Sequence, residues 1–250
     1  MGRWFILRSS QRRLLRMLNL VSFFTTHITR QTLKVAKEKP EESKSILLAL
    51  LDMDKSVNWA VGQVADIYYD GKHPKHFLWT SHNDFIVDNI EVNEKVIDIG
   101  CGASAYTMRL ADKGANVLGI DLNPERITAI KKTNVHPNLC YEVMDIMREL
   151  PEERFDVAIC SHLIEHLENP VSFLKNLHNI TSRIIIKVPR VDSGWKKLMK
   201  KDLGLFWLDD VTHFKEYTMD ILQNELTKSG WKPVVAETGL DLRVIAKPIE

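Results

Sequence analysis

The sequence predicts an α/β protein with a mostly parallel sheet, an antiparallel C-terminal hairpin, helices flanking the sheet and an N-terminal helical extension. From residue 95 onward, short apolar runs alternate with helical patterns, as in parallel strands joined by right-handed crossovers. The first apolar run breaks into two glycines, Gly100 and Gly102, which is typical of a buried strand that ends in a tight turn. The final two runs are joined by a turn at Thr238 and Gly239, so we expect a terminal hairpin.

Individual elements follow from the period of the apolar residues. Strands are expected over residues 95–99, 116–120, 139–143, 155–160, 184–188, 233–237 and 242–246. Helices are expected over residues 105–113, 124–133, 170–179 and 218–229. Pro124 suits the first turn of its helix, and Gly230 suits the position just after the last helix. Three more helical patterns, over residues 46–53, 57–69 and 77–90, precede the first strand.

The chain of 250 residues, 44% of them hydrophobic, is long enough for one sizeable α/β domain plus an appendage. We divide it into a basic leader and linker (1–44), a helical cap (45–92) and a ligand-binding domain (93–250). Three cysteines, Cys101, Cys140 and Cys160, lie in or beside the expected core strands. Their odd number favours a reducing, cytoplasmic setting over a disulfide framework.

The net charge of +1 conceals a basic leader, because residues 1–39 contain nine Arg or Lys residues and one acid. Leu14, Leu18 and Val21 recur at helical spacing opposite Arg12 and Arg16, which predicts a basic amphipathic helix. Its uncharged stretch, residues 17–28, is shorter than the roughly 20 residues of a membrane span. Residues 1–37 are therefore expected to lie on an anionic membrane surface at the inner membrane face, or to pack on the body with a solvated basic face. A targeting segment is the third alternative.

The glycine turn within residues 96–104 is followed, at the end of the next strand, by Asp121. A glycine turn with an acid about 20 residues later is typical of nucleoside sites, where the acid accepts hydrogen bonds from ribose hydroxyls. Gly100, Gly102 and Ala105 also satisfy the dinucleotide pattern, so an NAD-dependent oxidoreductase stays open. Asp98 favours a different ligand, because a carboxylate there would repel a pyrophosphate but attract an ammonium and a sulfonium group. These two cationic groups occur together in S-adenosylmethionine (SAM).

At this point the chain resembles the class I SAM-dependent methyltransferases, whose first motif, acid-x-Gly-x-Gly, is matched by Asp98, Gly100 and Gly102. The resemblance covers roughly residues 75–248 and implies a Rossmann-like, seven-stranded sheet. It implies that Asp121 binds the ribose and Asp145 the adenine amino group. The full set of implied cofactor residues is Asp98, Gly100, Cys101, Gly102, Asp121, Leu122, Asn123, Asp145, Ile146 and Ser161.

His162, Glu165 and His166 form an H-x-x-E-H pattern, which also occurs in zinc proteases. The expected strand-to-helix turn excludes that class, because the protease pattern lies within a long helix. The segment also resembles small-RNA 2′-O-methyltransferases and ubiquinone-pathway O-methyltransferases, which hold a divalent metal with Glu-x-x-Glu-His. Here His162 replaces the first glutamate, which disfavours magnesium and leaves zinc open. Our preferred expectation is that Glu165 and His166 only begin a helix, are satisfied by backbone groups and hold no metal.

Two further segments are expected to face the acceptor. His213 follows an insertion rich in lysine and aromatic residues (195–207) and is the first candidate for general base, with His162 as a second catalytic candidate. The polar turn at residues 69–76, with Tyr69, Lys72 and His73, is expected to close over substrate or to be an ordinary solvated loop. The reaction is expected to be in-line transfer of the methyl group to an oxygen.

Taken together, the basic leader, the turn at 69–76 and the segments 163–170 and 212–218 are similar to methyltransferases of surface-glycan synthesis. We therefore expect O-methylation of a small-molecule or glycan acceptor, such as a cell-surface glycan or a lipid-linked sugar precursor. Metal-assisted O-methylation of a quinol or an RNA 2′-hydroxyl, an NAD-dependent oxidoreductase and a non-catalytic SAM-binding protein stay open as alternatives. Nucleic-acid binding is disfavoured because the body is acidic and its aromatic residues do not alternate with a basic stripe.

Overall fold

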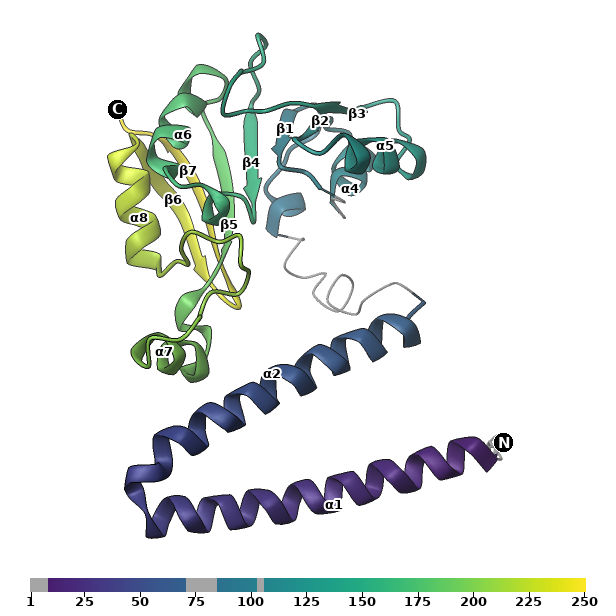
Figure 1. The fold of residues 1–250 in the computed structure, drawn as a ribbon. Coiled ribbons are helices and arrows are strands. Elements are labelled where there is room, and N and C mark those ends of the chain that lie inside the picture. Colours follow the sequence, from purple (N-terminus) through teal and green to yellow (C-terminus); the bar gives the residue numbers. More distant parts are fainter. Residues whose placement is uncertain (1–8, 71–84, 103–105) are drawn as a thin grey trace. The chain divides into compact units, whose positions relative to one another are not determined.

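A computed structural model describes residues 9–70, 85–102 and 106–250 (Figure 1). The chain divides into two compact units, Met1–Lys75 and His76–Glu250. The first unit is helical and the second contains the sheet.

The N-terminal unit consists of α1 (Ser9–Glu38), a single 3-10 turn η1 (Pro40–Glu42) and α2 (Ser43–Tyr68). The two helices predicted over residues 46–53 and 57–69 are one continuous helix, because nothing between them breaks a helix. Pro40 occupies the first turn of η1, which joins α1 to α2. None of the helices among the described residues combines the length and the apolarity needed to cross a membrane.

The helix predicted over residues 77–90 lies mostly outside the described residues. Residues 85–88 are helical, and Phe85, Ile86 and Ile90 are buried in the core of the second unit.

The second unit is built on a seven-stranded sheet in the order β3-β2-β1-β4-β5-β7-β6. Five strands are parallel: β1 (Lys95–Ile99), β2 (Asn116–Asp121), β3 (Leu139–Val143), β4 (Val157–Ser161) and β5 (Ile184–Pro189). The hairpin of β6 (Trp231–Thr238) and β7 (Asp241–Pro248) places β7 antiparallel beside β5. All seven predicted strands are therefore confirmed, with ends that differ by two residues or fewer. The order reverses at β1, which places a crevice at the carboxyl ends of β1 and β4.

Helices cover both faces of this sheet (Figure 1). They are α4 (Thr107–Asp112), α5 (Pro124–Thr133), α6 (Pro170–Asn176) and α8 (Met219–Lys228). The helix α7 (Trp195–Asp202) lies beyond the ends of the strands, and three short 3-10 turns, η3 (Ile164–His166), η4 (Leu177–Asn179) and η5 (Val191–Ser193), complete the unit. Alternate residues of β1 separate two cores, because Val96 packs with α4 and α5 whereas Ile97 packs with α6 and α8. The 3-10 turns η4 and η3 replace parts of the regular helix expected there.

Residues 190–217 form an insertion between β5 and α8, and α7 lies within it. Its two ends are adjacent, because Arg190 and Tyr217 form an isolated parallel bridge and the amide of Val191 donates to the carbonyl of Tyr217 at 2.9 Å. The ring of Tyr217 is fully buried, and its hydroxyl donates to Glu225 on α8 at 2.9 Å. The two ends of the insertion are thus held side by side, next to the end of β5 and against α8.

Candidate active site

The turn after β1 needs glycine at two positions. Gly100 has φ +72° and Gly102 has φ +52°, in the left-handed region that side chains disfavour. A Cβ atom at Gly100 would also lie 3.0 Å from Cδ1 of Leu163. The amides of Gly100 and Cys101 both donate to the carbonyl of Ile120, at 2.8 and 2.9 Å, which fixes the turn against β2.

Asp121 ends β2 directly beside this turn. Its Oδ2 accepts from the amide of Gly102 at 2.9 Å, and its Oδ1 accepts from the amide of Asn123 at 2.8 Å. The side chain of Asn123 caps α5 by accepting from the amides of Glu125 and Arg126. Backbone amides thus hold the carboxylate of Asp121 at the mouth of the crevice, whereas the side chain of Asn123 caps α5 and is not directed to a ligand.

Asp98 is the fourth of the five residues of β1 and is fully buried, with its Oδ1 accepting from the hydroxyl of Tyr106 at 2.7 Å. Cys101 is also buried, and burial, with the nearby charges of Asp98 and Asp121, raises the pKa of its thiol. Cys101 is therefore a neutral packing group at the base of the turn.

A pocket of about 360 Å³ opens at the carboxyl ends of the strands. Its described lining includes six predicted site residues: Gly100, Asp121, Leu122, Asp145, Ile146 and His162. Leu163, His166 and Thr212 complete the wall on the far side of the turn. The described lining does not include the other predicted residues, Asp98, Cys101, Gly102, Asn123, Ser161 and His213. Asp145 accepts from the amide of Met147 at 3.0 Å and pairs with Arg148.

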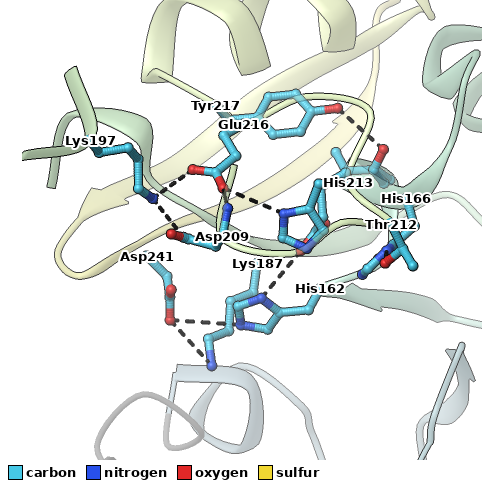
Figure 2. Close-up of polar contacts among 12 residues, drawn as sticks. His162, His166, Lys187, Lys197, Asp209, Thr212, His213, Glu216, Tyr217 and Asp241 are labelled. Carbon is cyan, nitrogen blue, oxygen red and sulfur yellow. Dashed lines mark hydrogen bonds and ion pairs between the residues drawn. The ribbon is translucent and has the colours of Figure 1, made fainter. Parts of the chain in front are cut away.

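His162 follows β4 and has φ +52°, which is unusual for a side chain other than glycine. Its amide donates to the carbonyl of Lys187 on β5 at 2.8 Å, and its side chain is 42% exposed at the pocket. Nδ1 of His162 lies 3.3 Å from Oε1 of Glu165, and Nε2 lies 3.9 Å from Oδ2 of Asp241. The imidazole therefore has a carboxylate near each nitrogen (Figure 2).

Glu165 is completely buried, and neither of its carboxylate oxygens accepts a hydrogen bond from the described residues. Beside it, the rings of His166 and His213 meet edge to face with centroids 4.5 Å apart. One side-chain ligand atom from each of Glu165, His166 and His213 lies within 4.8 Å of the others. A buried carboxylate without hydrogen bonds is costly unless a cation compensates it. This constellation therefore fits a metal ion.

The expectation that backbone groups satisfy Glu165 and His166 is wrong. The carboxylate of Glu165 has no such donor among the described residues, and Nδ1 of His166 instead pairs with the hydroxyl of Thr212 at 2.9 Å. Glu165 and His166 also do not begin a regular helix, because the 3-10 turn η3 ends at His166 and α6 starts only at Pro170.

Sequence reasoning missed Thr212, which contacts His166, and Glu216, which lies beside His213. It also missed Lys197, which pairs with Glu216 (Figure 2). The amide of Phe214 donates to the carbonyl of Glu165 at 2.8 Å, which brings this part of the insertion against η3. One signal was available in the sequence, because His-x-x-Glu occurs twice, ending at Glu165 and at Glu216.

The predicted substrate turn is only partly described. Tyr69 follows α2 in the N-terminal unit and is partly exposed, with its ring edge to face against Tyr68 at 5.0 Å. Lys72 and His73 lie outside the described residues.

Comparison with known proteins defines the class. Residues 97–183 match the family model described as a methyltransferase domain. Together with the sheet order and its terminal hairpin, this match shows that the chain contains a class I SAM-dependent methyltransferase domain.

Curated relatives and solved structures refine this picture. The ubiquinone biosynthesis O-methyltransferase of Bradyrhizobium diazoefficiens is 30% identical over 141 residues, covering 54% of this chain and 55% of that protein. The ubiquinone biosynthesis O-methyltransferase of Glaesserella parasuis is 32% identical over 95 residues, covering 35% of this chain and 40% of that protein. This chain thus spans about half the length of the first of these relatives and less of the second.

Among solved structures, a magnesium protoporphyrin IX methyltransferase from Synechocystis with bound S-adenosylhomocysteine superposes with a TM-score of 0.58 at 16% identity. The superposition covers 82% of this chain and 99% of that one. A SAM-dependent methyltransferase from Mesorhizobium loti gives a TM-score of 0.53 at 16% identity, covering 67% of this chain and 96% of that one. At this identity, these likenesses bear on the fold alone.

Proposed function

We propose that the protein is a SAM-dependent O-methyltransferase that acts on a quinol-type hydroxyl with the help of a divalent cation. The observation that carries the proposal is the buried carboxylate of Glu165, which forms no hydrogen bond with the described residues. It lies beside the imidazoles of His166 and His213, with Nδ1 of His162 3.3 Å from its Oε1. His166 belongs both to this cluster and to the lining of the pocket beside the glycine turn. The names of the curated relatives favour a quinol over the glycan acceptor expected from sequence.

Residues of the first half of the domain would hold SAM. Asp121 would accept hydrogen bonds from the ribose hydroxyls, because it stands at the mouth of the pocket with both oxygens oriented by amides. Asp145 and Ile146, further along the wall, would contact the adenine. The turn at Gly100 leaves room for the methionine part of the cofactor, because no side chain projects from it.

Glu165, His166 and His213 would hold the cation. One carboxylate and two imidazoles suit zinc or ferrous iron better than magnesium, which prefers oxygen ligands. Such an ion would favour ionisation of the acceptor hydroxyl and orient it. We therefore assign His213 to cation binding instead of the general-base role expected from sequence.

We assign the role of general base to His162, which would take the proton from the hydroxyl group that is methylated. It lines the pocket and is exposed there, whereas the side chain of His213 is nearly buried. The acceptor oxygen attacks the methyl carbon in line, the new C–O bond forms as the C–S bond breaks, and the hydroxyl proton passes to His162. The remaining contribution of the protein is alignment of the two reactants and exclusion of water.

Transfer of label from methyl-labelled SAM tests the proposal against its alternatives. We expect label on a demethylated quinol and none on an RNA 2′-hydroxyl or a lipid-linked sugar. Glu165→Gln should lower kcat/KM on the order of 100-fold, because the acceptor loses its alignment. The matched control Glu168→Gln, at an exposed glutamate in the same segment, should leave it unchanged. Label on RNA or sugar alone would overturn the acceptor, and thermal stabilisation by NAD but not SAM would overturn the class.

We also propose that α1 holds the protein on an anionic membrane surface, where a lipid-soluble quinol would be found. The helix carries Arg16, Arg30, Lys34 and Lys37 toward one side and has no acidic residue in its first turn. Met17 and Ile28, toward the other side, are exposed. Replacing Arg16, Arg30 and Lys34 by glutamine should abolish sedimentation with anionic vesicles, and equal sedimentation of both proteins would refute this assignment.

A further inference from the structure

Glu216 is a buried glutamate in the insertion, and its charge is held in place by groups of that insertion. Its side chain is 0% exposed, and its Oε2 accepts from Nζ of Lys197 on α7 at 2.6 Å. Its Oε1 accepts from the backbone amide of Asp209 and lies 3.5 Å from Nδ1 of His213 (Figure 2). Lys197 also pairs with Asp209 at 2.6 Å, so this ammonium is shared between two carboxylates.

Nδ1 of His213 is buried and forms no hydrogen bond with the described residues, and the carboxylate of Glu216 lies 3.5 Å from it. A neutral imidazole carries one proton, and a carboxylate beside Nδ1 favours the tautomer with the proton on that nitrogen. The lone pair is then on Nε2, which becomes the ligand atom. In metal sites, histidine ligands are oriented in this way by outer carboxylates and carbonyl groups.

The neighbouring histidine is oriented in the same way from the same loop. The hydroxyl of Thr212 donates to Oδ1 of Asp210 at 2.7 Å, so it is left to accept from Nδ1–H of His166 at 2.9 Å. Hydrogen bonds from Thr212 also lower the pKa of Asp210, which keeps this acceptor ionised. Both histidines therefore direct Nδ1 to an oxygen atom of residues 209–217.

We propose that Glu216 is a positioning residue, which holds His213 in the Nδ1–H tautomer so that Nε2 points to the cation held with Glu165 and His166. The inference rests on the cation site of the proposed function and adds the residue that prepares it. Lys197 and the amide of Asp209 supply the donors that satisfy the buried carboxylate of Glu216 and hold it beside His213. The competing role is structural, in which Glu216 only anchors α7 through Lys197.

Two measurements on the full chain separate these roles. The first is titration with Co²⁺, followed by visible absorption, of the wild type, Glu216→Gln and the control Glu168→Gln. Loss of an outer-shell carboxylate should weaken Co²⁺ binding roughly 10- to 100-fold in Glu216→Gln. The second is the tautomer of His213 in metal-free protein at pH 8, read from long-range ¹H–¹⁵N correlations. We expect Nδ1–H in the wild type and a shift toward Nε2–H in Glu216→Gln, which a purely structural ion pair would not produce.

The outcomes are distinct. Absence of Co²⁺ binding by the wild type overturns the cation site and this inference together. Normal Co²⁺ binding by Glu216→Gln with an unchanged tautomer overturns the inference alone and leaves the proposed function standing. If Glu216→Gln does not fold, the ¹H–¹⁵N spectrum of the wild type still tests the inference. A proton on Nε2 of His213 in that spectrum would refute the proposed Nδ1–H tautomer.

Discussion

Replacing Gly100 by alanine perturbs the turn between β1 and the pocket in a way that the structure allows us to estimate. The left-handed conformation at φ +72° costs an L-residue roughly 1–2 kcal/mol. The new Cβ would lie 3.0 Å from Cδ1 of Leu163, which is the end of a flexible side chain and can move aside, so we expect the backbone conformation to dominate the cost. For a domain of this size, that conformational cost corresponds to a fall in Tm of about 2–8 °C.

Thermal unfolding followed by tryptophan fluorescence measures this effect, since Trp231 is buried in the core of the same unit. Gly194→Ala is the matched control, because Gly194 has φ −167° and an added methyl group would meet no atom within 4 Å, so the stability should change by about 0.5 kcal/mol or less. Combining Gly100→Ala with Leu163→Ala separates the two costs. An unchanged Tm in Gly100→Ala, or a loss that disappears when Leu163 is shortened, would refute the argument from backbone conformation.

Three further predictions follow from burial and charge. Asp121→Asn should weaken SAM binding about 10- to 100-fold by calorimetry, because a charged acceptor of the ribose is lost, and unchanged affinity would remove Asp121 from the site. Iodoacetamide at pH 8 should alkylate exposed Cys140 and spare Cys101 and Cys160, whose burial raises the pKa of both thiols, and mass spectrometry of the peptides would show any exception. Burial and the charge of Glu225 raise the pKa of Tyr217, so the folded state resists its ionisation. Its stabilising contribution is present below about pH 10 and is lost as pH rises further, because the unfolded chain then releases the proton first. The free energy of unfolding should fall less between pH 9 and 11 in Tyr217→Phe than in the wild type, and equal slopes would contradict this.

The parallel sheet could be predicted from sequence because each strand carries its own apolar pattern. Val96 and Ile97 face opposite cores, so both must be apolar, and this produces the unbroken runs that identify buried strands. The glycine turn and Asp121 could be predicted for a similar reason, since backbone geometry and one acid at a strand end leave a local signature.

The acceptor side could not be predicted to the same extent, because its contacts join residues distant in sequence. The pairing of His166 with Thr212 spans 46 positions, and His213 reaches Glu165 only because the amide of Phe214 bonds to η3. Periodicity carries no information about such a loop. The sequence pattern also could not show that the carboxylate of Glu165 is buried without a backbone donor, since this burial depends on how η3 packs under the insertion.

The bridge between Arg190 and Tyr217 affects which changes of length and sequence the segment between these two residues can tolerate. Because Arg190 and Tyr217 lie side by side, we expect the segment between them to tolerate changes of length around α7, away from its contacts with η3 through Phe214 and with α8 through Lys215. This segment also lies beyond the stretch matched to the methyltransferase family. If His213 and Glu216 act as proposed, the groups that hold and orient the cation on the acceptor side come partly from this one segment. Grafting residues 191–216 between the same two positions of another class I domain would then test whether acceptor preference moves with the segment.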